Sequence, residues 1–149
     1  MDHQESPTLQ TLLVAADLSF SKPDILNDQV WELSAGSGVV RALILSTSFG
    51  LRARRFQLFP RFTLGDATVS DPNEFIDYPN IHFASTNFIC LGMKPFKDID
   101  VTARFWVPES QAICGQYTFH NSSERTVPIT ISLLCLLVPV MAGEPGPVP

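Results

Sequence analysis

Charge, cysteine and helix signals are all scarce in this chain, and each shortage excludes a class of protein. Charged residues make up 17% of the 149 residues, where about a quarter is usual. The balance is acidic, with a formal net charge of −5, so the chain as a whole does not attract nucleic acid or anionic lipid. A chain with so little charge is expected to hide much of its surface, either in its own core or against a partner.

Cysteine is rare and widely spaced, since the chain has three, Cys90, Cys114 and Cys135. There is no CxxC motif and no histidine beside any of them, which argues against a zinc site. Each lies in an apolar, strand-like run, where a free cysteine behaves as a small hydrophobic residue. We therefore predict buried thiols in a reducing compartment, the cytoplasm. One disulfide with an unpaired third thiol is the alternative.

The sequence predicts neither a secretory signal nor a membrane span. The N-terminal residues, MDHQESPTLQ, are polar and acidic, whereas a signal peptide has a basic start and an apolar centre. The longest apolar run, residues 129–142, is shorter than the roughly 20 residues that a spanning helix needs, and Pro139 interrupts it. A strand of the protein core is the better interpretation of this run.

Helical periodicity is almost absent, while strand-like alternation occurs nearly everywhere. Short strand-like segments joined by turns predict an all-β fold, an antiparallel β-sandwich of about eight to ten strands. We expect residues 1–8 to be a flexible tail, 9–140 to be the sandwich domain, and 141–149 to be a Pro/Gly-rich linker or truncated end. The strands expected most clearly are 9–18, 29–34, 39–47, 98–107, 111–121 and 126–140, and a short glycine loop joins 29–34 to 39–47 as a hairpin.

The stretch LRARRFQLFPRF, residues 51–62, concentrates four of the ten basic residues of an acidic chain. Its alternation inverts after Arg55, because Phe56 and Leu58 share parity with Arg54. A β-bulge near Arg54 and Arg55 would restore the alternation and keep both apolar side chains in the core. Pro60 then predicts an edge position or the end of a strand.

Three roles are open for the basic side chains of this stretch. They could pair with acids across a domain interface, or with the acidic connection 66–77 just downstream, which is the interpretation we favour. They could instead form a solvated strand face, or bind an anion such as phosphate through their forked guanidinium groups. The candidate interface or ligand contacts are Arg52, Arg54, Arg55 and Arg61.

No known catalytic motif is present, so we predict no catalytic residue, no metal and no cofactor. Asp98 and Asp100 could share a strand face, and Glu32 and Glu109 could meet after folding, but solvated acids are the ordinary interpretation. Aromatic rings can stack on the apolar faces of sugars. Trp31 and Trp106 are the candidates for such stacking, with packing in the core as the competing interpretation.

Three segments carry a resemblance to a known family: GQYTFHNSSERTVPITISLLCLLVPV, SFGLRARRFQLFPRFTLGDATVSDPNEF and DIDVTARFWVPESQAICGQYTF. They resemble the N-terminal β-sandwich of glycogen-debranching (amylo-α-1,6-glucosidase-like) and glucoamylase-like glycoside hydrolases, over roughly residues 25–140. The resemblance implies a supersandwich in which the first segment forms paired strands, joined by an Asn-x-Ser turn. In that family the catalytic acids lie on a helical (α/α)₆ barrel that follows the sandwich, so no catalytic residue is carried over to this chain.

Together these observations predict a non-catalytic β-sandwich domain, or a truncated piece, of a carbohydrate-processing enzyme. Its expected partner is a C-terminal catalytic domain or a partner subunit, with a glycan as a further ligand. The alternative is a stand-alone module that binds carbohydrate or protein. A third hypothesis is a structural subunit that self-associates through uncovered sheet edges.

Overall fold

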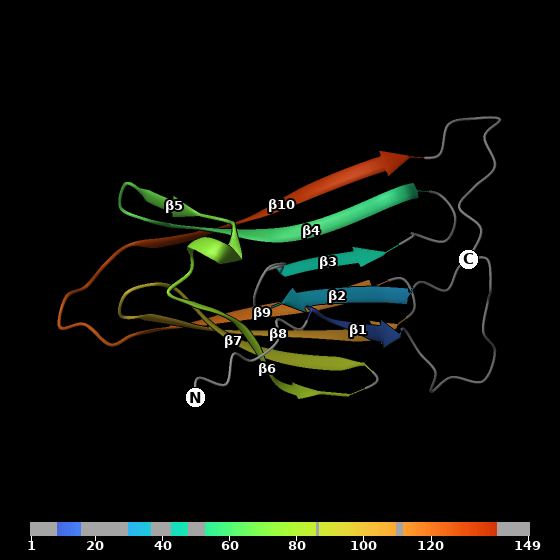
Figure 1. The fold of residues 1–149 in the computed structure, drawn as a ribbon, viewed down its shortest axis with the longest axis horizontal. Coiled ribbons are helices and arrows are strands. Elements are labelled where there is room, and N and C mark those ends of the chain that lie inside the picture. Colours follow the sequence, from blue (N-terminus) through green and yellow to red (C-terminus); the bar gives the residue numbers. More distant parts are fainter. Residues whose placement is uncertain are drawn as a thin grey trace, which may run out of the picture.

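The computed structural model describes residues 9–15, 30–36, 43–47, 53–85, 87–109 and 112–139, and it confirms the all-β sandwich (Figure 1). The described residues form ten strands and one short 3₁₀ helix, η1 (Pro72–Glu74). The strands are β1 (Leu9–Ala15), β2 (Val30–Gly36), β3 (Leu43–Thr47), β4 (Ala53–Leu64), β5 (Ala67–Val69), β6 (Asp77–Ala84), β7 (Phe88–Phe96), β8 (Ile99–Glu109), β9 (Ala112–Asn121) and β10 (Ile129–Pro139). The tail 1–8 and the linker 141–149 lie outside the described residues.

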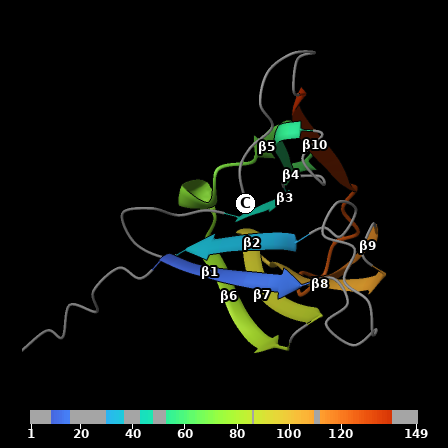
Figure 2. The same ribbon diagram turned by 90° about the vertical axis from the view of Figure 1, so that its right-hand side faces the viewer.

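The strands form two antiparallel sheets. The first sheet has six strands in the order β1-β2-β3-β4-β10, with β5 added beside β4. The second sheet has four strands in the order β6-β7-β8-β9. Figure 2 shows β10 at the end of the first sheet that lies away from β6 and β7.

The core lies between the two sheets and is formed by every second residue of the strands. Along β7 every second residue is buried, from Ile89 to Pro95, and β8 repeats the pattern from Ile99 to Val107. Successive side chains of a strand point to opposite faces, so one face of each strand enters the core and the other faces outward. The facing sheet contributes buried side chains from β2, β3 and β4: Trp31, Leu33, Leu43, Leu45 and Phe62.

The predicted hairpin of 29–34 with 39–47 is confirmed, since β2 pairs with β3 in antiparallel register from Trp31 opposite Thr47 to Ala35 opposite Leu43. The stretch 65–80 is more ordered than a plain connection. It contains β5, η1 and the start of β6, and its Phe75 is buried against Phe62 with ring centroids 5.8 Å apart.

The predicted bulge in the arginine stretch is confirmed by the pairing of β4 with β10. Arg55 lies opposite Val138, but the next pair is Ala53 with Pro139, so Arg54 is the extra residue on β4. The shift occurs where the alternation of the sequence inverts. It keeps Phe56 and the even-numbered residues after it on the inner face of the sheet.

The expectation that Pro60 marks an edge or a strand end is wrong. Pro60 is buried in the middle of β4 and lies opposite Leu133 of β10. On the other flank of β4, pairing with β3 ends at Leu58 and pairing with β5 begins at Phe62. Pro60 thus falls in a gap between two partner strands, where a residue without an N–H group is tolerated.

The segment from β9 to β10 does not form a pair of adjacent strands, which corrects the expectation taken from the family resemblance. β9 pairs with β8 in the second sheet, whereas β10 crosses over to pair with β4 in the first. The connecting turn has the predicted side-chain chemistry. The Asn121 Oδ1 atom accepts hydrogen bonds from the backbone N–H of Ser123 at 3.0 Å and from its hydroxyl at 2.7 Å.

Candidate interaction surface

β10 is an edge strand, because within the described residues it pairs with β4 on one flank and with no strand on the other. Its C-terminal half is exposed. The exposed fractions are 60% for Leu133, 42% for Leu136, 55% for Leu137 and 38% for Val138, and the neighbouring Cys135 is exposed too. We call these five residues the apolar edge.

The prediction of a core strand over this run is therefore wrong for the second half of β10. Ile129 and Ile131, in the first half, are partly buried and pack against the core. In the second half Leu136 and Leu137 are 42% and 55% exposed, so the described strands leave this part of β10 largely uncovered.

The apolar edge is apolar on both of its faces. On the inner face, Cys135 lies opposite Leu58 and Leu137 lies opposite Phe56 of β4. On the outer face are Leu136 and Val138, and residues 129–139 contain no charged side chain at all. Strands that are apolar on both faces belong in the interior of a sheet, and exposed edges normally carry charges that prevent further pairing.

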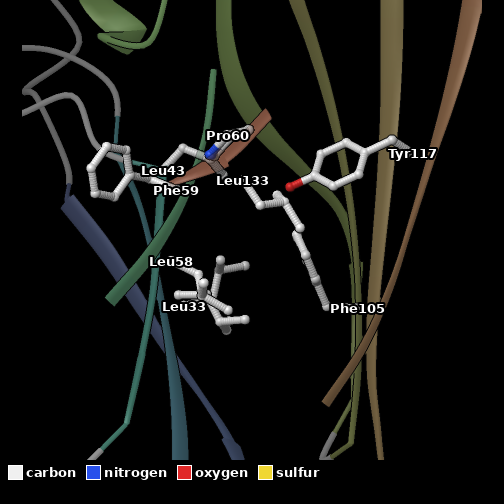
Figure 3. Close-up of a pocket in the computed structure, with 9 residues that line it drawn as sticks. Leu33, Leu43, Leu58, Phe59, Pro60, Phe105, Tyr117 and Leu133 are labelled. Atoms are coloured by element: carbon white, nitrogen blue, oxygen red, sulfur yellow. The ribbon is translucent and has the colours of Figure 1, made fainter. Parts of the chain in front are cut away.

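An apolar pocket opens between the sheets beside the apolar edge (Figure 3). The Tyr117 side chain reaches into it from β9, and burial raises the pKa of its phenol from 10.0 to about 12. Leu133 contributes the wall on the β10 side, so the pocket is continuous with the exposed strand. The lining residues are Leu33, Leu43, Leu45, Leu58, Phe59, Pro60, Phe105, Tyr117 and Leu133.

The outer face of the second sheet carries a smaller aromatic group. Phe88 lies opposite Trp106, and the Phe83 ring is 5.9 Å from that of Phe88, centroid to centroid. Phe83 is 57% exposed, while Phe88 and Trp106 are partly buried. On the same sheet lies an open polar hollow lined by Asp77, Asn80, His82, Gly92, Met93, Lys94, Asp100, Val101 and Thr102.

The two tryptophans proposed for sugar stacking lie in different environments. Trp31 is 4% exposed and its ring meets Phe56 edge-on at 6.1 Å, so it offers no face to a sugar. Its indole nitrogen is buried without a hydrogen-bond partner. Trp106 lies on the outer face and is the one of the pair that a ligand could reach.

The structure describes the four candidate arginines to different extents. Arg61 is exposed on β4 and lies opposite Ser132, on the same face as Leu136 and Val138 of the apolar edge. The backbone of Arg54 and Arg55 belongs to β4, but their side chains lie outside the described part of the structure, as does the whole of Arg52.

The paired acids considered for chemistry do not form a catalytic arrangement that the structure describes. Asp98 lies in the turn before β8 with a φ of 65°. Asp100 is on β8, where its carboxylate is 3.3 Å from the Lys94 ammonium and 3.8 Å from the His120 Nδ1 atom. The side chains of Glu32 and Glu109 are not among the described groups. Within the described ranges no three His, Cys, Asp or Glu residues come together in a way that could hold a metal ion.

The three cysteines are free thiols, but they are less buried than predicted. Cys90 and Cys114 are partly buried, and Cys135 is exposed. The prediction of a buried thiol is wrong for Cys135 because it belongs to the uncovered half of β10.

Comparisons with family models, with curated proteins and with solved structures found no match for this chain. The resemblance to the sandwich of debranching enzymes, and the roles expected from it, therefore stay predictions. Among the described residues, no helix is long and apolar enough to cross a membrane.

The sequence alone did not point to the apolar edge as a surface, although it carried a signal for it. The run from Leu133 to Val138 is apolar at consecutive positions, which indicates burial on both faces. Whether the chain itself provides that burial depends on which strands pair, and strand pairing is a property of the whole fold.

Proposed function

We propose that this chain is a non-catalytic β-sandwich that works as a protein-binding module, with the apolar edge of β10 as its docking surface. The observation that supports this is the exposure of Leu133, Leu136, Leu137 and Val138 on a strand that has no partner on one flank among the described strands. Covering the exposed part of each side chain contributes roughly 1 kcal/mol apiece. A free strand edge adds unpaired backbone groups that a partner strand can satisfy.

Arg61 fits the same proposal as a charge at the rim of the docking surface. It shares a face with Leu136 and Val138 and is exposed. Interfaces typically have an apolar centre and a polar rim, and arginine is enriched in them. This is the interface role favoured for the arginine stretch. The expected partner, a catalytic domain or subunit of a carbohydrate-processing enzyme, fits such a surface.

The test is a photo-crosslinking amino acid placed at Leu136 in the full chain and expressed in the source cells. Its matched control is the same crosslinker at Ile76, which is 60% exposed and lies outside β10. We expect a discrete protein adduct from position 136 and none from position 76, and Leu133→Lys should abolish it. The proposal is wrong if position 136 yields no adduct beyond that of position 76.

A second candidate function is sugar binding on the outer face of the second sheet. The observation that favours it is the aromatic group at Trp106, on the sheet that also carries the polar hollow around Asp100 and His82. A panel of immobilised oligosaccharides would test it, with Trp106→Ala expected to weaken binding about tenfold, equal to about 1.4 kcal/mol. Leu136→Ala should leave binding unchanged. If the wild-type chain retains no oligosaccharide, this candidate is excluded.

A further inference from the structure

An edge strand can pair antiparallel with the same strand of a second copy, and the two copies are then related by a two-fold axis. We propose that β10 pairs antiparallel with β10 of a second copy of this chain, so that two first sheets join into one continuous sheet. This inference rests on the proposed function, because it names the partner that docks on the same surface.

Self-pairing is favoured first by the absence of the features that protect edge strands. β6, at the edge of the second sheet, has two register shifts against β7 and an exposed Asp77. Such bulges and charges prevent a foreign strand from adding to an edge. β10 pairs with β4 without interruption from Ile129 to Val138, and its only shift is at Pro139. On its other flank β10 pairs with no described strand, and its residues are uncharged, so this flank is able to receive another strand.

The geometry of antiparallel pairing also collects the exposed side chains in one place. Two identical strands that pair antiparallel are related by a two-fold axis perpendicular to their sheet, so both inner faces point to the same side. The inward-facing Leu133, Cys135 and Leu137 of each copy then meet at the centre, between the two second sheets. Leu134 and Leu136 of both copies meet in the same way on the outer face.

Only a few registers are possible for this pairing, because each inward-facing residue must lie opposite an inward-facing residue of the second copy. Opposed residues must share a face, so residue numbers in a pair must add to an even number. Centring the axis on Cys135 places Leu133 opposite Leu137 of the second copy and Leu134 opposite Leu136. This register uses the whole apolar edge and leaves no exposed leucine of β10 without an apolar neighbour.

The length of the contact agrees with the pairing of two edge strands. β10 has eleven residues, and centring the axis on Cys135 pairs residues 131–139 of the two copies, about 31 Å of strand. Along this length the two strands share main-chain hydrogen bonds, which supply affinity when one strand adds to the edge of a sheet.

The test is the solution mass of the full chain, measured by light scattering over a dilution series. We expect twice the chain mass of 16.5 kDa for the wild type. Leu136→Lys should give the monomer mass, because it places a charge in the centre of the contact, on the outer face where folding tolerates it. Ile76→Lys, at a position of comparable exposure outside β10, should remain a dimer. Circular dichroism of each variant checks that the sandwich is folded.

A single-cysteine chain provides a second, independent measurement. With Cys90 and Cys114 replaced by serine, a short bis-maleimide should link Cys135 to Cys135 of the second copy. A monomeric wild type that is not cross-linked overturns the self-pairing proposal. If that monomer still gives a position-136 adduct with a different protein in cells, the protein-binding function holds without it. If there is no such adduct either, both proposals fail.

Discussion

At the residue scale, Phe62 is the centre of the aromatic core. It is completely buried, and its ring lies within 6.3 Å of the rings of Phe75, Tyr117 and Phe119, centroid to centroid. Its neighbours come from the 3₁₀ region and from β9, so it joins the two sheets. We expect Phe62→Ala to lower the free energy of unfolding by about 3–5 kcal/mol, because the cavity cannot close from either sheet.

Urea denaturation measures this loss directly. The matched control is Phe83→Ala, which removes the same side chain from a position that is 57% exposed and should cost no more than about 1 kcal/mol. Equal losses for the two variants would show that Phe62 does not hold the sheets together.

The buried phenol of Tyr117 predicts that the folded chain loses stability at alkaline pH. Its phenol has a pKa raised by burial from 10.0 to about 12, so between these values the folded chain keeps a proton that the unfolded chain loses. Its contribution to stability is therefore complete below pH 10 and is lost as the pH rises from 10 to about 12.

The measurement is urea denaturation at a series of pH values for the wild type and for Tyr117→Phe. The variant lacks the ionisable group, so its free energy of unfolding should fall less steeply over this interval. Parallel pH profiles for the two proteins would mean that the phenol is not protected by burial.

At the element scale, the turn between β9 and β10 carries the chain from one sheet to the other. Asn121 accepts two hydrogen bonds from Ser123, and its amide donates to the backbone carbonyl of Arg125 at 2.6 Å. We expect Asn121→Ala to reduce the free energy of unfolding by about 1–2 kcal/mol, since three local bonds are lost together.

Asn80→Ala is the control for this turn, because the Asn80 amide donates a single bond, to the Tyr78 carbonyl. Thermal denaturation should show the smaller loss for Asn80→Ala. A Tm for Asn121→Ala as high as that of the control would indicate that the turn residues merely follow the strands.

The strands and the bulge could be predicted from the sequence, because each depends on local parity. The inversion of alternation at Arg54 and Arg55 is visible in the residues themselves, and the register shift lies at the same place. The position of Pro60 and the sheet to which β10 belongs could not be predicted. Both depend on which strands become neighbours, and an apolar run such as Leu133 to Val138 is compatible with several positions in a sheet.

At the scale of the whole molecule, the sandwich is uneven, with six strands facing four. The end of β10 is exposed, and its exposed side chains are leucines and valine rather than charged residues. The apolar side chains between the two sheets are buried, whereas those at the end of β10 are exposed. This exposed strand is the basis of our proposal that a second copy of the chain associates with the molecule here.

The most direct test is hydrogen exchange of the backbone amides of residues 129–139 in the full chain. About half of the amides of an edge strand point away from their partner strand and exchange quickly in a monomer. We predict slow exchange at every residue from 131 to 138 in the wild type, and fast exchange at alternate positions in Leu136→Lys. Fast alternate exchange in the wild type as well would contradict the claim that a second copy covers this edge.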